Sequence, residues 1–141
     1  MDRYLDTTRQ GPMFLRRPEV AGLVVDALQR GAAVGYYDLR AFVVMGNHVH
    51  ALFRPIAGAS RVLQWLKGTT AREANLVLGR TGKAFWQRES YDHWVRDEGE
   101  LERITAYIEN NPVRAELAPD PSQYGWSSAR KSGELKFAAA R

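Results

Sequence analysis

Two of the three histidines in this 141-residue chain are separated by one residue, in the segment His48-Val49-His50. If this segment is a β-strand, both imidazoles point to the same side of it, because side chains alternate along a strand. Two imidazoles on a rigid element suit a divalent metal ion, and a hydrogen-bonded pair is the alternative. The chain has no cysteine and no His-Glu-x-x-His motif, so any further ligands are oxygen or amide groups. Such a donor set favours Mg²⁺ or Mn²⁺.

A second pair of polar side chains lies on a predicted helix near the end of the chain. Tyr107 and Asn111 are four residues apart, so they lie one above the other on the helix. A tyrosine beside a divalent cation can attack a phosphodiester and form a covalent phosphotyrosine, which retains the energy of the broken bond for rejoining. The amide oxygen of Asn111 could bind the same cation. The alternative is a tyrosine that only packs at the helix edge, before a helix-ending asparagine.

Hydrophobic patterning and turn residues predict the elements that position these groups. Extended segments are expected at Arg3–Thr8, Tyr36–Met45, His48–Phe53 and Phe85–Arg96, with Gly46-Asn47 as a type II′ hairpin turn. Helices are expected from Pro18 to just before Gly31, from Ser60 to Leu78, and from Asp97 to Pro112. Asp97 and Glu100 form an acidic variant of the capping box, and Pro112 is expected to end the last helix.

The order of the first six elements predicts an α+β fold, a ferredoxin-like βαββαβ antiparallel sheet with two helices on one face. The helix that carries Tyr107 is an addition to this plan. Val49, Ala51 and Phe53 should pack under the two helices, so the histidines should project from the other, open face. One domain is expected over residues 1–130, followed by a polar tail, 131–141, that is a candidate for disorder.

The net charge of +4 is concentrated in one part of the chain. Residues 61–96 hold seven basic and three acidic residues, an excess equal to that of the whole chain. The hypothesis is a surface that contacts DNA phosphates, and a solvated helix face is the alternative. The predicted DNA-binding residues are Arg61, Lys67, Arg72, Arg80, Lys83 and Arg88. The aromatic residues nearby, which could stack on unpaired bases or pack in the core, are Trp65, Phe85, Trp86 and Trp94.

Several segments together resemble the HUH single-tyrosine transposases, and in particular the branch called REP-associated tyrosine transposases. These segments are Met45–Phe53, Gln87-Arg88, Tyr91-Asp92-His93, Val95-Arg96-Asp97, Tyr107-Ile-Glu-Asn-Asn-Pro-Val-Arg114 and Trp126-Ser127-Ser128. The resemblance implies an HUH nuclease fold. It also implies an enzyme that nicks and joins single-stranded DNA beside a hairpin, with Mg²⁺ or Mn²⁺, through a 5′-phosphotyrosine.

The same resemblance implies roles for individual residues. His48 and His50 match the metal-binding histidines, Tyr107 matches the nucleophile, and Asn111 matches a third polar group four residues after it. Tyr91 is the second candidate for the nucleophile. Single-stranded or hairpin DNA is the expected partner, bound by a monomer or a homodimer.

Two other classes of function compete with this interpretation. A non-catalytic ferredoxin-like module that binds nucleic acid would need neither the histidine pair nor Tyr107. A metal-dependent hydrolase of small phosphoesters would release product without a covalent protein adduct. No apolar run is long enough to cross a membrane and the first residues do not resemble a signal peptide, so we expect a cytoplasmic, nucleoid-associated protein.

Overall fold

The computed structural model describes residues 1–7, 13–86 and 90–130, with only the backbone for 90–92. The strands are β1 (Arg3–Thr7), β2 (Tyr37–Val44), β3 (Val49–Pro55) and β4 (Ser90–Trp94). The helices are α1 (Pro18–Ala33), α2 (Ala59–Leu78) and α3 (Glu98–Arg114), with short 3-10 turns η1 (Phe14–Arg16) and η2 (Pro121–Gln123). The predicted tail, 131–141, lies outside the described residues.

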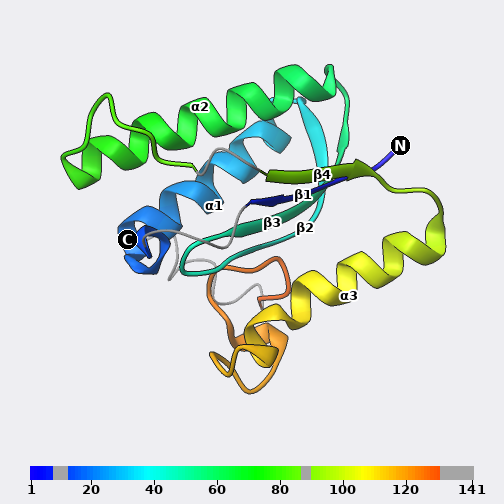
Figure 1. The fold of residues 1–141 in the computed structure, drawn as a ribbon. Coiled ribbons are helices and arrows are strands. Elements are labelled where there is room, and N and C mark those ends of the chain that lie inside the picture. The colour runs from blue at the N-terminus through cyan, green and yellow to red at the C-terminus, as the bar shows by residue number, and fades with distance from the viewer. Residues whose placement is uncertain (8–12, 87–89, 131–141) are drawn as a thin grey trace.

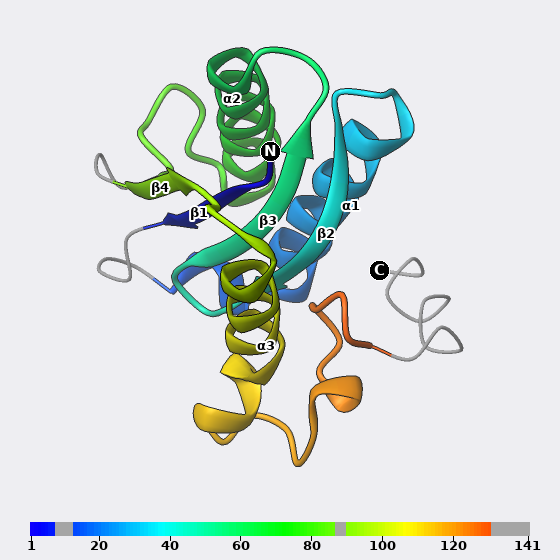
Figure 2. The same ribbon diagram turned by 90° about the vertical axis from the view of Figure 1, so that its right-hand side faces the viewer.

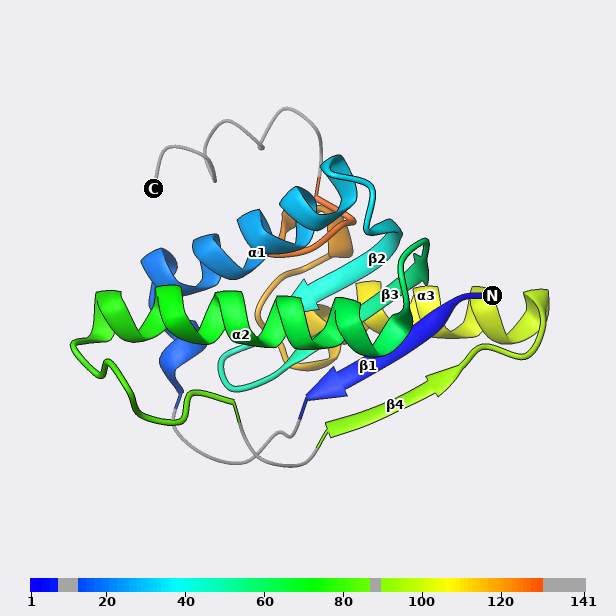
Figure 3. The ribbon, with the colours of Figure 1, turned by 90° about the horizontal axis from the view of Figure 1, so that it is seen from above.

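The four strands form one antiparallel sheet in the order β2-β3-β1-β4 (Figures 1 and 2). This order places β1 between β3 and β4, as the ferredoxin-like plan requires, so the predicted fold class is confirmed. After α3 the chain returns to the sheet, where Ser127 pairs with Val43 on the outer side of β2. Figure 3 shows α1 and α2 above the sheet, with β4 at its edge beyond α2.

The two faces of the sheet are covered by different helices. Helices α1 and α2 lie on one face, and α3 lies against the other (Figure 1). The expectation of an open second face is therefore wrong, because α3 carries an apolar residue, Ile108, that is fully buried against it. Partners of Ile108 in this smaller cluster include Val43 from β2 and Leu52 from β3. Burial of the apolar side of α3 that carries Ile108 keeps this helix on the sheet.

Two helices extend further than the sequence predicts. Helix α1 continues through Gly31 to Ala33. Glycine at position 31 makes room for Tyr37, because a Cβ there would overlap the Tyr37 ring. Helix α3 continues through Pro112 to Arg114, and Pro112 is buried inside it. A proline removes one backbone donor without forbidding the next residues from helical geometry, and the amide of Ala115 still bonds the Asn111 carbonyl at 3.0 Å.

The predicted N-cap Asp97 at the start of α3 is confirmed, and the return bond of the box goes to the residue before it. The Asp97 carboxylate accepts a hydrogen bond from the Glu100 amide at 2.8 Å, and Glu100 accepts one from the Arg96 amide at 2.7 Å. The bond from the Arg96 amide, together with one from the Arg96 guanidinium, lowers the pKa of Glu100. The start of α3 is therefore determined by a local pattern of residues.

The connection between β2 and β3 is not the predicted type II′ turn. That turn needs a positive φ at Gly46, and Gly46 is absent from the described glycines with positive φ. A Cβ at Gly46 would lie 2.5 Å from the terminal carbon of Met13 and 2.9 Å from the Cγ of Arg16, so these two flexible side chains would have to shift for a larger residue. Strand β3 also begins at Val49 and ends at Pro55, one and two residues later than predicted. Within the predicted extended segment Phe85–Arg96, the described residues form a strand over β4, and 87–89 lie outside the described residues.

Candidate active site

Strand β3 separates its side chains as the alternation predicts. Val49, Ala51 and Phe53 pack into the core under α1 and α2. The rings of His48 and His50 lie together on the α3 side, with their centroids 4.9 Å apart. The histidines do not project into open space, however, because His48 is 8% exposed and His50 is fully buried. They form the floor of a site that α3 covers.

His50 is held by a partner on each ring nitrogen. Its Nδ1 lies 2.7 Å from the Tyr4 hydroxyl and 3.5 Å from a carboxylate oxygen of Asp6, both on β1. Its Nε2 lies 3.2 Å from the amide of Asn111. With a proton on Nδ1, facing Tyr4 and Asp6, the lone pair of Nε2 faces Asn111. A metal-binding histidine is commonly oriented in this way, by an acceptor at its other nitrogen.

Helix α3 brings Tyr107 and Asn111 to the same histidine. The Tyr107 ring meets the His50 ring edge to face, with centroids 5.5 Å apart. Asn111 is buried one turn further along and makes the contact with Nε2 described above. The spacing of four residues therefore places both side chains on the side of the helix that faces the sheet, and the structure brings all four candidate metal and nucleophile residues together.

Arg114 is a site residue that the sequence analysis did not select. Its guanidinium lies over the Tyr107 ring, 4.1 Å from the centroid, in a cation–π contact. It reaches the ring because α3 continues through Pro112, which puts Arg114 two helical turns after Tyr107. The spacing of seven residues was a usable signal, but the expectation that Pro112 ends the helix concealed it. A fixed positive charge beside the phenol suits chemistry in which negative charge develops there.

The donor atoms at this site fit a small divalent cation. Two imidazoles and one primary amide give nitrogen and oxygen ligands, which Mn²⁺ and Mg²⁺ accept together with water. A half turn of the Asn111 amide presents its oxygen in place of its nitrogen. Within the described ranges, no three His, Cys, Asp or Glu residues cluster as a metal site. The third protein ligand would therefore be the amide of Asn111.

The predicted DNA-binding residues lie elsewhere. Those that the structure describes are on α2 and the loop after it, across the sheet from the histidines (Figure 1). Arg61, Arg72 and Lys83 are exposed. Arg80 is partly buried, with its guanidinium 4.9 Å from the Phe14 ring centroid. Arg88 lies outside the described residues. The structure does not bring the described DNA-binding candidates into the candidate active site around His50.

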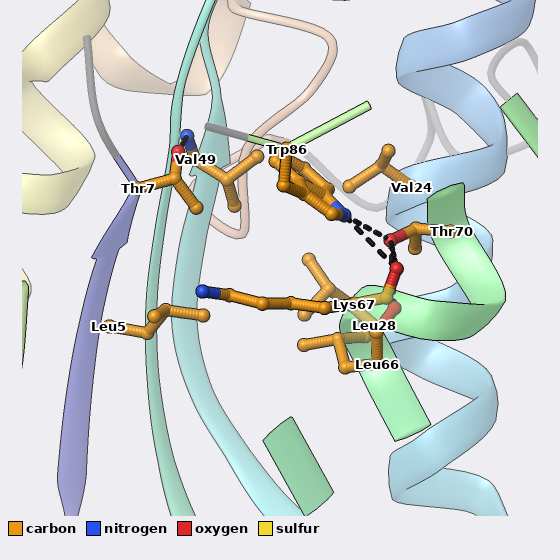
Figure 4. A pocket seen from close by; sticks show the side chains of 9 residues that line it. All are labelled: Leu5, Thr7, Val24, Leu28, Val49, Leu66, Lys67, Thr70 and Trp86. Carbon is orange, nitrogen blue, oxygen red and sulfur yellow. Dashed lines mark hydrogen bonds between the residues drawn. The ribbon is translucent and has the colours of Figure 1, made fainter. Parts of the chain in front are cut away.

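Lys67 lies over a small apolar pocket between α2 and β1 (Figure 4). The pocket has about 10 Å³ of free space, enough for one water molecule at most. Trp86 closes it from the side and donates hydrogen bonds to the Thr70 hydroxyl at 2.9 Å and to the Lys67 carbonyl at 3.2 Å. This pocket is part of the packing of α2 against the sheet.

The aromatic residues proposed for base stacking mostly have packing roles. Trp65 meets Tyr36 edge to face, and Phe85 lies against Trp86. Trp94 on the edge strand β4 differs from them, because it is 43% exposed and has the guanidinium of Arg3 4.5 Å from its ring. The side chain of Tyr91, the second candidate nucleophile, lies outside the described residues.

The family model described as "Transposase IS200 like" matches residues 19–111, more than half of the chain, and includes both histidines, Tyr107 and Asn111. The chain belongs to the IS200-like transposase family. The resemblance drawn from the sequence is thus confirmed at family level, and with it the enzyme class, a DNA-cleaving transposase. This class argues against a non-catalytic binding module. No curated protein matches the chain in sequence.

Solved structures of two proteins share the fold. One is a REP-associated tyrosine transposase bound to a REP hairpin, with a TM-score of 0.68 and 18% identity, covering 99% of this chain and 79% of that one. The other is a candidate transposase from Deinococcus radiodurans, with a TM-score of 0.55 and 24% identity, covering 78% of this chain and 89% of that one. In the part of the chain that the structure describes, no helix is long and apolar enough to span a bilayer.

Proposed function

We propose that this transposase nicks single-stranded DNA beside a hairpin and joins strands through a 5′-phosphotyrosine at Tyr107. The observation that carries the proposal is the surroundings of His50, where the Tyr107 ring (5.5 Å between centroids) and the Asn111 amide (3.2 Å from Nε2) meet. The two alternative interpretations were a histidine pair that only forms hydrogen bonds and a tyrosine that only packs at the helix edge. Neither explains why Tyr107 and Asn111 both meet the buried ring of His50. A phosphodiester enzyme needs such an arrangement.

His48, His50 and Asn111 would hold the divalent ion. When bound there, Mg²⁺ or Mn²⁺ would polarise a non-bridging phosphate oxygen and orient the phosphorus. Tyr4 and Asp6 keep the His50 ring in position from its other nitrogen. The protein thus supplies both the ligands and the groups that orient them.

Tyr107 supplies the nucleophilic oxygen. A bond forms between this oxygen and the phosphorus while the bond from phosphorus to the 3′ oxygen breaks, and the phenolic proton passes through solvent to the leaving 3′ hydroxyl. Arg114 stabilises the negative charge that develops during attack, from its position over the ring. Attack of a 3′ hydroxyl on the phosphotyrosine reverses these bonds, so joining needs no other energy source.

The DNA partner is inferred from family and fold. The structural relative described above is bound to a REP hairpin, and the net charge of this chain is positive, which suits a polyanion. We infer that hairpin-bearing single-stranded DNA is the substrate and that the protein acts at the nucleoid.

The decisive experiment is adduct formation. The protein is mixed with hairpin-bearing single-stranded DNA and Mn²⁺, and a covalent complex that survives denaturant is sought. We expect an adduct whose DNA-linked peptide contains Tyr107. A linked peptide containing Tyr91 would move the nucleophile but keep the enzyme class. Product without an adduct would favour hydrolysis.

A further inference from the structure

The structure assigns a second DNA subsite, a pocket for one unpaired nucleobase at the end of the β2–β3 hairpin; this inference rests on the proposed function. The pocket has a volume of about 320 Å³ and opens to the surface. Its lining residues are Met13, Leu15, Arg16, Gly46, Leu117, Tyr124 and Trp126. They come from three segments far apart in the chain, namely 13–16, Gly46 at the end of the hairpin, and 117–126 after α3.

Hydrogen bonds to the hairpin hold the walls in place. The Tyr124 hydroxyl donates to the Val44 carbonyl at 2.7 Å, and the Val44 amide donates to the Trp126 carbonyl at 2.9 Å. The Leu15 amide donates to the Gly46 carbonyl at 3.0 Å. Burial raises the pKa of Tyr124 to about 12, so its hydroxyl stays a donor at neutral pH. The pocket is therefore formed before any ligand arrives.

The pocket lies next to the candidate active site. Gly46 in its floor is two residues before His48. Leu117 in its wall is three residues after Arg114, and the Leu117 amide donates to the carbonyl of Pro112 in the last turn of α3 at 2.8 Å. On the proposed function, a DNA strand with one phosphate at Tyr107 would therefore have its neighbouring nucleotides within reach of this opening.

The chemistry of the lining matches a nucleotide. Trp126 and Leu117 offer apolar surface for a flat ring, and aromatic stacking is the sequence-tolerant way in which proteins hold unpaired bases. Arg16, the one charged residue among the seven, is placed to meet the attached phosphate. Met13 and Leu117 are large apolar residues that stay about half exposed, at 48% and 56%. The volume is at the low end for small-ligand pockets, so it accepts one base and excludes a duplex.

The test uses binding, in a Tyr107→Phe protein that cannot cut. A hairpin is selected by this protein from a pool with randomised unpaired arms, and each arm position is then replaced in turn by an abasic site. We expect one position at which loss of the base weakens binding about tenfold. In the Met13→Ala/Leu117→Ala variant, intact DNA should bind about tenfold more weakly, and the abasic penalty at that position should fall below about twofold.

Matched variants control for general effects. Ile56→Ala/Leu76→Ala removes two exposed apolar side chains outside the pocket and should keep the full abasic penalty. Arg16→Gln should weaken binding, whereas Arg17→Gln, with a guanidinium already paired to Glu19 at 2.5 Å, should not. The proposal is overturned if no abasic position matters, or if the pocket variant weakens intact and abasic DNA equally. A change in oligomeric state with unchanged DNA binding would also overturn it and would assign the pocket to a second copy of the chain.

The outcome is separable from that of the proposed function. If wild-type protein forms no covalent adduct while the abasic penalty still depends on the pocket, the nucleobase subsite stands and the phosphotyrosine chemistry fails. If the adduct forms at Tyr107 and no abasic penalty is found, the chemistry stands and the subsite fails.

Discussion

The two faces of the sheet bury different kinds of side chain. Among the described residues, the cluster under α1 and α2 contains 17 buried residues and the cluster under α3 contains seven. The smaller cluster adjoins a buried polar group, in which His50 contacts Tyr4 and Asn111. Each strand contributes alternate side chains to the two faces of the sheet. One face therefore holds most of the hydrophobic core, and the other holds the candidate active site.

The strongest test of this division is the same substitution made on both faces. Tyr107→Phe should abolish the DNA adduct and change the free energy of unfolding by less than about 1 kcal/mol, because it removes only an oxygen from a half-buried ring. Tyr37→Phe should leave adduct formation intact. It should lower the free energy of unfolding by about 1–2 kcal/mol, because the Tyr37 hydroxyl donates to the Leu28 carbonyl at 2.6 Å in the core.

Adduct yield on denaturing gels and urea unfolding measure the two effects. Tyr91→Phe is a further control and should keep at least partial activity. The division would be wrong if Tyr37→Phe removed the adduct in a folded protein, or if Tyr107→Phe cut DNA.

The second test uses neighbouring positions in β3 and immediately before it. His48→Ala with His50→Ala should remove both nicking and the rise in melting temperature that Mn²⁺ gives the wild type by mass action. Phe53→Ala, on the other side of the strand, should lower the free energy of unfolding by about 3–5 kcal/mol through the cavity it leaves. In the wild type, Mn²⁺ affinity should fall as pH is lowered into the acid range, because protonated imidazole cannot bind metal.

Calorimetric titration of Mn²⁺ at several pH values, with a melting curve for each variant, checks these outcomes. Unchanged Mn²⁺ binding and DNA cleavage in the histidine double variant would place the metal site elsewhere.

A third, smaller effect compares the two cation–π contacts. Arg114→Gln should slow adduct formation about tenfold at saturating DNA, because Arg114 lies over the nucleophile. Arg80→Gln removes the contact with Phe14 on the far side of the sheet and should leave this rate unchanged. Single-turnover kinetics separates the rate from binding. Equal slowing by both substitutions would mean that Arg114 acts only through general charge.

The smallest effect is expected from the basic surface of α2. Replacing Lys67, Arg72 and Lys83 by Gln should weaken DNA binding and flatten its dependence on salt. On single strands, the logarithmic slope should change by about 0.7 for each phosphate that the variant no longer neutralises. Adduct formation at saturating DNA should not change. An unchanged slope, measured by fluorescence anisotropy over a range of salt, would show that these residues form only a solvated helix face.

Sequence alone determined the features that depend on local periodicity. Alternation put His48 and His50 on one side of β3, the spacing of four put Tyr107 above Asn111, and the Asp97 capping box set the start of α3. Each follows from bonds and geometry within a few residues, which a pattern in the chain records directly. The order of elements and the family segments then predicted the fold and the enzyme class.

The tertiary structure decided which of these local features meet. Asn111 reaches His50 because Ile108 is buried against the sheet beside Leu52, a packing choice between residues more than fifty positions apart. The same side of α3 buries Pro112, and the helix continues past it to bring Arg114 over Tyr107. No local pattern encodes such contacts, because burial of apolar surface has no preferred direction and depends on how the whole chain closes around its core.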